Sequence, residues 1–296
     1  MREEDLTIFE YRKGKEIKYT DLIKSEKLLG RSEKISYYTT EAGYVDGYIY
    51  RPKVSRNEKI PMVFNFHGGG MVLGYCEQDG KYCQELADKT GVAIINVDYP
   101  IAPEFKYPLP ILASFSFIKQ VVANAEKYNL LCDNVSVMGH SAGGYISAAL
   151  SILAHQDTEL KFKCMINDYA VLRQDKNPEF RKAVDPNKAI PVSRMQEYYN
   201  WYFEKCSDPS EYLASPCNAP GNYFPPSFIL IAEYDALAEE EEEFYNNLVE
   251  HNILAKIKVY PNCQHGFTHD CFEEYDEVQS KIAWNDMSLF LKEHIF

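Results

Sequence analysis

The sequence predicts an α/β fold with a mostly parallel central sheet that is flanked by helices. Two observations lead to this prediction. Apolar segments of strand length alternate with segments of helical pattern along most of the 296 residues. The apolar segments are also nearly continuous, as is typical of parallel strands buried on both faces. Alternation of this kind places helices on both faces of one sheet.

The strand-like segments are short and are bounded by Gly, Pro or Asn. They are Pro61–Phe66, Val92–Asp98, Asn134–Met138, Cys164–Asn167, Ser227–Ala232 and Ala255–Tyr260. The helical segments between and after them are Glu77–Thr90, Ile111–Tyr128, Ala142–Ala154, Glu239–Asn252 and Tyr275–His294. An earlier stretch, Lys34–Tyr50, alternates with a period of two residues, which predicts antiparallel edge strands.

Two segments depart from this alternation. Met1–Gly30 is highly charged and is expected to be helical, and Val171–Tyr223 is too long for a simple connection between a strand and a helix. An insertion at the carboxyl edge of a parallel sheet lies where α/β enzymes bind ligands. We therefore expect four parts: an N-terminal cap segment (1–30), a first part of the core (31–170), a cap insertion (171–223) and a second part of the core (224–296).

Composition limits the classes of partner. The formal net charge is −13, which argues against nucleic acid or an anionic membrane as the main partner. A mean hydropathy of −0.38 and the lack of a long uncharged apolar window predict no membrane span. The charged N-terminal stretch predicts no secretory signal. The eight cysteines form no Cys-x-x-Cys pair, so we expect free thiols in a cytoplasmic protein.

The segment Gly139–Gly144 (Gly-His-Ser-Ala-Gly-Gly) follows a predicted strand and begins a predicted helix. That context is required for a nucleophile elbow, in which a tight turn exposes a serine hydroxyl, here of Ser141, above the sheet. Gly139 and Gly143 leave room for a close approach of the backbone. Taken alone, the motif is equally consistent with a glycine-rich turn that only begins a helix.

A second glycine-rich motif, His67-Gly68-Gly69-Gly70, ends the strand Pro61–Phe66. Successive glycines after a strand expose backbone N–H groups, which can bind an oxyanion or a phosphate. The chain lacks the Lys-Ser/Thr pair that follows a phosphate-binding loop, so the oxyanion interpretation is favoured. His67 is expected to position this loop rather than to transfer a proton.

A serine nucleophile needs a base, because a free hydroxyl is a poor nucleophile near neutral pH. His265 follows the last predicted strand and lies in a loop from which it can reach the sheet edge. His269 is its nearest competitor. His140 adjoins the serine, but neighbouring side chains in an elbow point in different directions, so it is a poor candidate.

The acid that orients the histidine should follow the preceding strand, which gives the chain order Ser, acid, His. Asp235 leaves the carboxyl end of Ser227–Ala232, and Glu233 is the competing carboxylate. The acidic run Glu239–Glu243 begins a predicted helix, where negative charge suits the helix dipole. We expect this run to be a solvated first turn.

Two further clusters have more than one interpretation. Metal-ligand residue types gather in one loop, but their spacing matches no zinc template, so no metal is expected; they are Cys263, His265, His269, Asp270 and Cys271. Aromatic residues cluster in a helical stretch of the cap insertion, where they can belong to the core or line a pocket; they are Tyr198, Tyr199, Trp201, Tyr202 and Phe203. The pocket candidates are His140, Tyr199, Trp201 and Tyr202.

Together these motifs resemble the hormone-sensitive-lipase family of α/β-hydrolases, which includes bacterial carboxylesterases and acetyl esterases. The resemblance extends from about residue 34 to the C-terminus, and the motifs appear in the family's order. The matching segments are His67–Gly70, Val97–Glu104, Gly139–Gly144, Ala214–Pro216, Glu233–Leu237 and His265–Phe267. Three positions depart from the family pattern: His140 replaces Asp or Thr, Pro100 replaces Arg, and Ala236 replaces Pro.

The resemblance implies an α/β-hydrolase fold and a role for each site residue. Ser141 is the implied nucleophile, Asp235 the orienting acid and His265 the base. The implied oxyanion donors are the backbone N–H groups of Gly69, Gly70 and Ala142. The family's cap is built from the N-terminus and from the insertion before the acid strand.

We therefore expect a serine carboxylesterase that hydrolyses small, largely uncharged, short-acyl esters through an acyl-enzyme, without cofactor or metal. An amidase-type hydrolase such as an arylformamidase is the alternative within enzymes, since the same triad attacks activated amides. A non-catalytic ligand-binding homologue is the alternative from another class, and the presence of His265 counts against it. A homodimer is compatible with the sequence but is not required by it.

Overall fold

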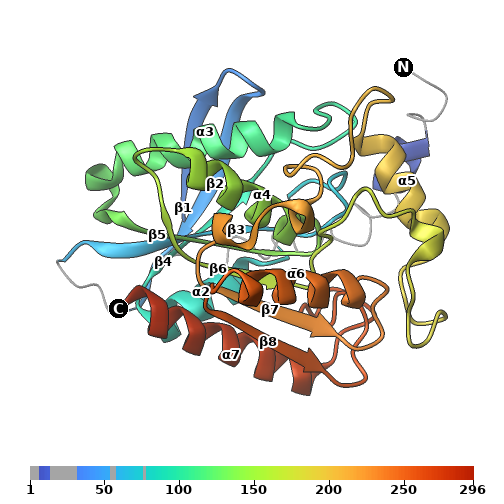
Figure 1. Ribbon diagram of the computed structural model, residues 1–296. Coiled ribbons are helices and arrows are strands. Elements are labelled where there is room, and N and C mark those ends of the chain that lie inside the picture. The colour runs from blue at the N-terminus through green and yellow to red at the C-terminus, as the bar shows by residue number, and fades with distance from the viewer. Residues whose placement is uncertain (1–6, 14–31, 54–57, 76–77) are drawn as a thin grey trace.

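The computed structural model describes residues 7–13, 32–53, 58–75 and 78–296 (Figure 1). One sheet of eight strands forms its centre, in the order β1-β2-β4-β3-β5-β6-β7-β8. The strands are β1 (Ser32–Thr39), β2 (Gly43–Tyr50), β3 (Ile60–Phe66), β4 (Ala93–Asp98), β5 (Leu130–His140), β6 (Phe162–Asp168), β7 (Ser227–Ala232) and β8 (Ala255–Tyr260).

The sheet is mostly parallel, as the sequence predicts. The six strands β3 to β8 pair in parallel, whereas β2 pairs antiparallel with both β1 and β4. The alternating stretch Lys34–Tyr50 therefore forms an antiparallel pair. Of these two strands, only β1 lies at an edge of the sheet. The bounds of β7 and β8 agree with prediction, and β5 begins earlier than predicted, at Leu130.

Helices cover both faces of the sheet (Figure 1). On one face lie α2 (Gly80–Thr90) and α7 (Glu277–Ile295), and on the other lie α3 (Leu109–Ala123), α4 (Ala142–Gln156) and α6 (Ala238–Glu250). Neighbouring residues of a strand pack on opposite faces of the sheet. Phe64 lies in the hydrophobic cluster with α3 and α4, and Val63 lies in the one with α2 and α7. This alternation explains why the central strands are apolar at nearly every position.

One predicted helix divides into two elements. The segment expected to be helical over Ile111–Tyr128 consists of α3 and a separate 3₁₀ turn at Ala125–Tyr128. Asn124 donates to the carbonyl oxygen of Gln120 from both its backbone and its side chain, which ends the helix. An asparagine side chain competes with the backbone in this way and favours helix ends.

The acidic run at the start of α6 is not a solvated turn, and that expectation was wrong for two of its members. Glu240 and Glu241 are 1% and 0% exposed. Glu241 accepts a hydrogen bond from the backbone N–H of Ala170 (2.8 Å), and Glu240 accepts one from that of Leu172 (2.7 Å). These carboxylates replace the backbone partners that the chain lacks where it leaves β6.

Most of the segment 171–223, including α5 (Val192–Tyr202), lies beyond the carboxyl ends of the strands, on the side toward which the arrows of β7 and β8 point (Figure 1), whereas its last residues pack against α4 and α6. The segment also carries short 3₁₀ turns at Pro178–Phe180, Pro216–Asn218 and Gly221–Tyr223. Of the N-terminal segment 1–30, residues 7–13 form a helix beside α5, and the rest lies outside the described residues. Among the described helices, none has the length and apolar character needed to cross a membrane.

Candidate active site

Ser141 occupies the turn between β5 and α4, with a backbone φ of 55° and ψ of −115°. A positive φ is rare for a residue with a side chain and is found mostly where the surroundings enforce it. The enforcement here is a close approach of two backbones, since a Cβ on Gly143 would lie 1.9 Å from the carbonyl oxygen of Phe66. The sharp turn projects the serine side chain beyond the carboxyl edge of the sheet.

Three side chains from separate loops meet at this turn. His265 Nε2 lies 2.8 Å from Ser141 Oγ, and His265 Nδ1 lies 2.5 Å from Asp235 Oδ2. Asp235 follows β7 and His265 follows β8, so the carboxyl ends of β5, β7 and β8 supply the three groups. Glu233, the competing carboxylate, accepts instead from the backbone N–H of Asn262 (2.6 Å).

The environment of His265 sets its basicity. Burial disfavours the charged ring, but the charge of Asp235 and its hydrogen bond outweigh this effect, so the pKa of His265 is raised above that of an ordinary histidine. The Asp235 carboxyl is 1% exposed, and its second oxygen accepts from the backbone N–H of Leu237 (3.2 Å). A histidine held in this way presents Nε2 toward the serine and is prepared to accept its proton.

The glycine-rich loop after β3 lies directly beside the serine. A Cβ on Gly68 would be 3.5 Å from the Cβ of Ser141. Gly70 has a φ of +61°, and the Tyr198 ring packs so closely on it that a Cβ would lie 2.7 Å away. His67 stacks on the ring of Tyr99 (4.3 Å between centroids), and the Tyr99 hydroxyl donates to the His67 carbonyl (2.8 Å). His67 thus packs beneath the loop, away from the serine hydroxyl.

A cavity of about 620 Å³ opens over these groups. Its lining includes Ser141, Ala142, His265, Gly68, Gly69 and Gly70, together with the pocket candidates His140, Tyr199 and Tyr202. Trp201, the fourth candidate, is not among the lining residues of the described chain. It is 3% exposed and stacks on Tyr11 of the helix at residues 7–13 (5.8 Å between centroids).

Sequence analysis missed two tyrosines that line the cavity, Tyr11 and Tyr169, whereas Tyr198 belongs to the aromatic cluster that the sequence singled out. Tyr169 follows β6 and lies 4.9 Å from the His265 ring, centroid to centroid. Its place directly after a predicted strand could have identified it, because strand ends on this edge face the cavity. Tyr11 and Tyr198 are joined by a hydroxyl contact of 2.7 Å between two distant parts of the chain, and no local pattern predicts that contact.

Comparisons with known proteins agree with this architecture. A family model described as the alpha/beta hydrolase fold matches residues 63–269. The chain is 30% identical over 211 residues to alpha/beta hydrolase R526 of Acanthamoeba polyphaga mimivirus, an alignment that covers 69% of this chain and 60% of the viral protein. It is 28% identical over 227 residues to carboxylesterase NlhH of Mycobacterium tuberculosis, which covers 75% of this chain and 70% of that protein.

Solved structures show the same likeness over nearly the whole chain. The esterase of Pyrobaculum calidifontis superimposes with a TM-score of 0.82 and 26% identity, covering 99% of this chain and 94% of that one. The metagenomic carboxylesterase EstE1 superimposes with a TM-score of 0.83 at 23% identity, with 98% of each chain covered, which is a likeness of fold.

Proposed function

We propose that this chain, which belongs to the α/β-hydrolase family of the hormone-sensitive-lipase type, is a serine carboxylesterase that acts on small, short-acyl esters. The main supporting observation is the series of contacts from Ser141 through His265 to Asp235 at the floor of a cavity. Esterases among the relatives and among the similar structures support the same class of reaction.

In the proposed reaction Ser141 Oγ attacks the ester carbonyl while His265 Nε2 accepts its proton. Asp235 keeps the hydrogen of the ring on Nδ1 and stabilises the imidazolium that forms. His265 then donates the proton to the departing alcohol, which leaves an acyl group on Ser141. Water, activated by the same nitrogen, releases the acid and restores the serine.

The negative charge that develops on the carbonyl oxygen needs donors that are already in place. We assign this role to the backbone N–H groups of Gly69, Gly70 and Ala142. Gly69 and Gly70 lie in the loop beside Ser141, and Ala142 is the first residue of α4. The N-terminus of α4 adds a favourable partial positive charge at the same place.

We assign the role of a cap to the segments 1–30 and 171–223, set on core parts 31–170 and 224–296. Tyr11 and Tyr198, one from each segment, both line the cavity. Tyrosine rings provide apolar walls, which suit an uncharged ester, and the packing of Tyr198 on Gly70 limits the space beside the oxyanion loop. This restriction favours short acyl chains.

Hydrolysis of p-nitrophenyl acetate, butyrate, octanoate and laurate by the wild type and by Ser141→Ala tests the proposal. We expect the rate to be greatest with the short chains and to fall by several orders of magnitude in Ser141→Ala. Ser151→Ala is a matched control, because it removes the hydroxyl of another buried serine, one that donates to Ser147 within α4 (2.9 Å).

A rate that persists in Ser141→Ala would contradict the proposed nucleophile. If neither protein hydrolyses any of the four esters, activated amides become the substrates to assay. Failure of a fluorophosphonate probe to label Ser141 in the folded wild type would favour a ligand-binding protein instead.

A further inference from the structure

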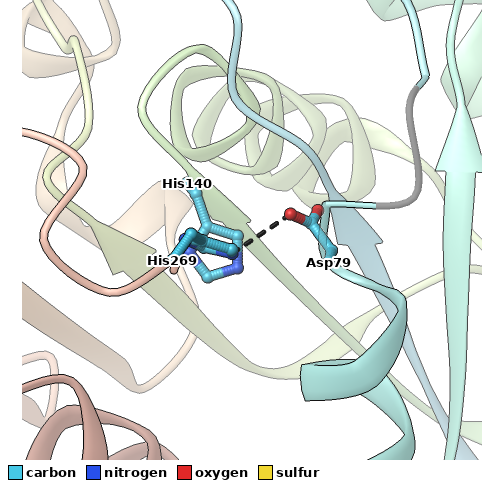
Figure 2. Close-up of side chains that lie close together, drawn as sticks. All are labelled: Asp79, His140 and His269. Atoms are coloured by element: carbon cyan, nitrogen blue, oxygen red, sulfur yellow. Dashed lines mark ion pairs between the residues drawn. The ribbon is translucent and has the colours of Figure 1, made fainter. Parts of the chain in front are cut away.

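A second cluster of buried polar side chains takes no part in the proposed reaction (Figure 2). Asp79 immediately precedes α2, His140 is the last residue of β5, and His269 lies in the loop after β8. Their exposed fractions are 0%, 1% and 0%. One nitrogen or oxygen atom from each lies within 4.8 Å of the others.

The hydrogen bonds around His269 fix the position of its proton. The Thr268 hydroxyl donates to Asp168 Oδ2 (2.8 Å), and the Tyr169 hydroxyl therefore supplies the hydrogen of its 2.6 Å contact with Thr268 Oγ1. His269 Nδ1 lies 2.9 Å from the Thr268 oxygen and 3.0 Å from the Tyr169 oxygen. The hydroxyl hydrogens of Thr268 and Tyr169 are both donated elsewhere. His269 Nδ1 must therefore carry the hydrogen that it shares with these two oxygens. In a neutral His269 ring, Nε2 is therefore a free lone pair.

The neighbours of this lone pair also lack a hydrogen. Asp79 Oδ1 lies 3.1 Å from His269 Nε2, while Asp79 Oδ2 accepts from the Asn65 side chain (2.9 Å). His140 Nδ1 faces Asp168 Oδ2 (2.7 Å), which leaves His140 Nε2 as the free nitrogen. Asp79 Oδ1, His140 Nε2 and His269 Nε2 are all buried and have no hydrogen-bond partner among the described residues. With both rings neutral, three electron-pair donors thus gather with no hydrogen between them.

Two buried carboxylates lie at this cluster. Asp79 and Asp168 are both 0% exposed, and within the described residues their ion pairs are with His269 and His140. Buried carboxylates are costly unless they are paired with a cation or coordinate a metal ion.

We propose that Asp79 Oδ1, His140 Nε2 and His269 Nε2 bind a divalent first-row transition metal ion, for which Zn²⁺ is a suitable probe. Two imidazoles and a carboxylate are ligands that zinc accepts. The 3.1 Å between His269 Nε2 and Asp79 Oδ1 is close to the separation of about 3.3 Å expected for two ligand atoms on tetrahedral zinc. Asn65 and Asp168 hold the opposite atoms of Asp79 and His140, as groups around protein metal sites do.

The proposed site differs from the loop considered in the sequence, where no metal was expected. Of that loop only His269 takes part, and its partners come from β5 and from the residue before α2. Three protein ligands leave one coordination position open, and His140 and His269 also line the cavity. A bound ion would link the turn at Ser141, the loop of His265 and the start of α2.

The test is a titration of the chelator-treated, full-length protein with Zn²⁺, followed by calorimetry and by thermal unfolding, with Mg²⁺ as the control ion. Exposed thiols are alkylated beforehand, since Cys132 and Cys206 are exposed. We expect one Zn²⁺ per chain, a Tm that rises with free Zn²⁺ and no comparable response to Mg²⁺. Asp79→Asn and His269→Gln should each weaken binding by more than about 100-fold, because even losing a group that holds a ligand costs 10–100-fold.

His155→Gln is the matched control, because His155 is exposed, lies in the last turn of α4 and stacks on Tyr223 (4.3 Å between centroids). Equal affinity in His155→Gln, Asp79→Asn and His269→Gln would overturn the proposal, as would absence of saturable binding to the wild type. Should both cluster variants fail to fold, the visible spectrum of Co²⁺ bound to the wild type decides: nitrogen and oxygen ligation supports the site, and sulfur ligation or no binding overturns it. Ser141→Ala should bind Zn²⁺ like the wild type, so this test is independent of the proposed esterase activity.

Discussion

Gly143 stands where two backbone segments cross without space for a side chain. Its missing Cβ would lie 1.9 Å from the carbonyl oxygen of Phe66, at the end of β3. The contact fixes the first turn of α4 against the glycine-rich loop after β3, and so it fixes the distance between Ser141 and that loop. A glycine is required here because any side chain would push the serine turn away from this loop.

We therefore expect Gly143→Ala to lower both stability and esterase activity. An added methyl group in a close-packed position costs about 1–3 kcal/mol of unfolding free energy, and the shift it forces separates Ser141 from its oxyanion donors. Denaturant unfolding and kcat/KM measure the two effects. Gly74→Ala is the control, because a Cβ there would lie 3.6 Å from Ile101, an ordinary contact. Similar losses in the two variants would contradict the steric argument.

We expect His265 to give the proposed reaction its dependence on pH. Its pKa is raised by Asp235 against the opposing effect of burial, and the protonated ring cannot accept the serine proton. In the wild type kcat/KM should therefore rise with pH through a midpoint above the pKa of an ordinary histidine.

Asp235→Asn should move that midpoint to lower pH, because burial still lowers the pKa of His265 while the main effect that raises it is removed. The maximal rate should fall by about 10⁴-fold, since the amide favours the wrong tautomer of the ring. The pH profile of kcat/KM measures both effects. Glu233→Gln, which changes the neighbouring carboxylate bonded to Asn262, should keep the wild-type profile. If the two variants gave the same profile, the role of Asp235 would be wrong.

At the scale of the element, α6 shows what composition alone does not reveal. Five consecutive glutamates suggest a solvated helix start, yet Glu240 and Glu241 point inward and hold the backbone that leaves β6. Burial raises the pKa of Glu240 to about 7, and it raises that of Glu241 well above the usual range. The first turn of α6 thus holds the backbone at the start of segment 171–223 by hydrogen bonds.

Glu241→Gln should become more stable relative to the wild type as the pH rises from about 5 to about 8. A carboxyl whose folded pKa is raised contributes its full stability below its unfolded pKa, and that contribution is lost as the pH rises toward the folded pKa. The variant does not titrate, and its amide oxygen can still accept from Ala170. Denaturant unfolding at several pH values measures the difference.

Glu239→Gln is the control for this series, because Lys176 lowers the pKa of the exposed Glu239. Its stability relative to the wild type should change little over the same range of pH, and any change should occur at lower pH. Parallel curves for Glu241→Gln and the wild type would show that Glu241 is not held in its neutral form.

The sequence predicted the central strands well because their signal is local. A continuous apolar run bounded by glycine or proline specifies a buried strand without reference to the rest of the chain, as the agreement at β7 and β8 shows. The serine turn is also marked by a local motif, and Asp235 and His265 were predicted because each directly follows a predicted strand. Contacts between distant segments were not predictable, and the gathering of Asp79, His140 and His269 is the clearest example.

At the scale of the whole molecule, the N-terminal helix is fastened to the core at the cavity rim. Arg12 Nε donates to the carbonyl of Val72 (2.7 Å), and its guanidinium forms a two-contact ion pair with Glu104 (2.6 and 2.8 Å). It also donates to the carbonyl of Ala102. Position 100, where the family's arginine is replaced by proline, supplies no such cation, but Arg12 brings one from a distant part of the chain.

Arg12→Met should loosen this attachment while keeping the apolar stem of the side chain. We expect a loss of about 1–3 kcal/mol in unfolding free energy from the hydrogen bonds to a charged group. KM should rise more than kcat falls, because Tyr11 on the same helix lines the cavity. Denaturant unfolding and steady-state kinetics measure these effects. Lys13→Met, a change at an exposed neighbour, should leave all three values near wild type; equal effects would contradict the role of Arg12.

All three groups at the serine turn come from the carboxyl ends of parallel strands, and most of the segment 171–223 lies on that side too. Within the described residues, none of these three groups comes from the opposite edge. Natural variation can therefore act on the two edges separately: changes on one side alter which molecules are accepted, and changes on the other alter how well the chain folds. Such a division lets a lineage acquire new substrates by exchanging one segment while it inherits the same catalytic framework.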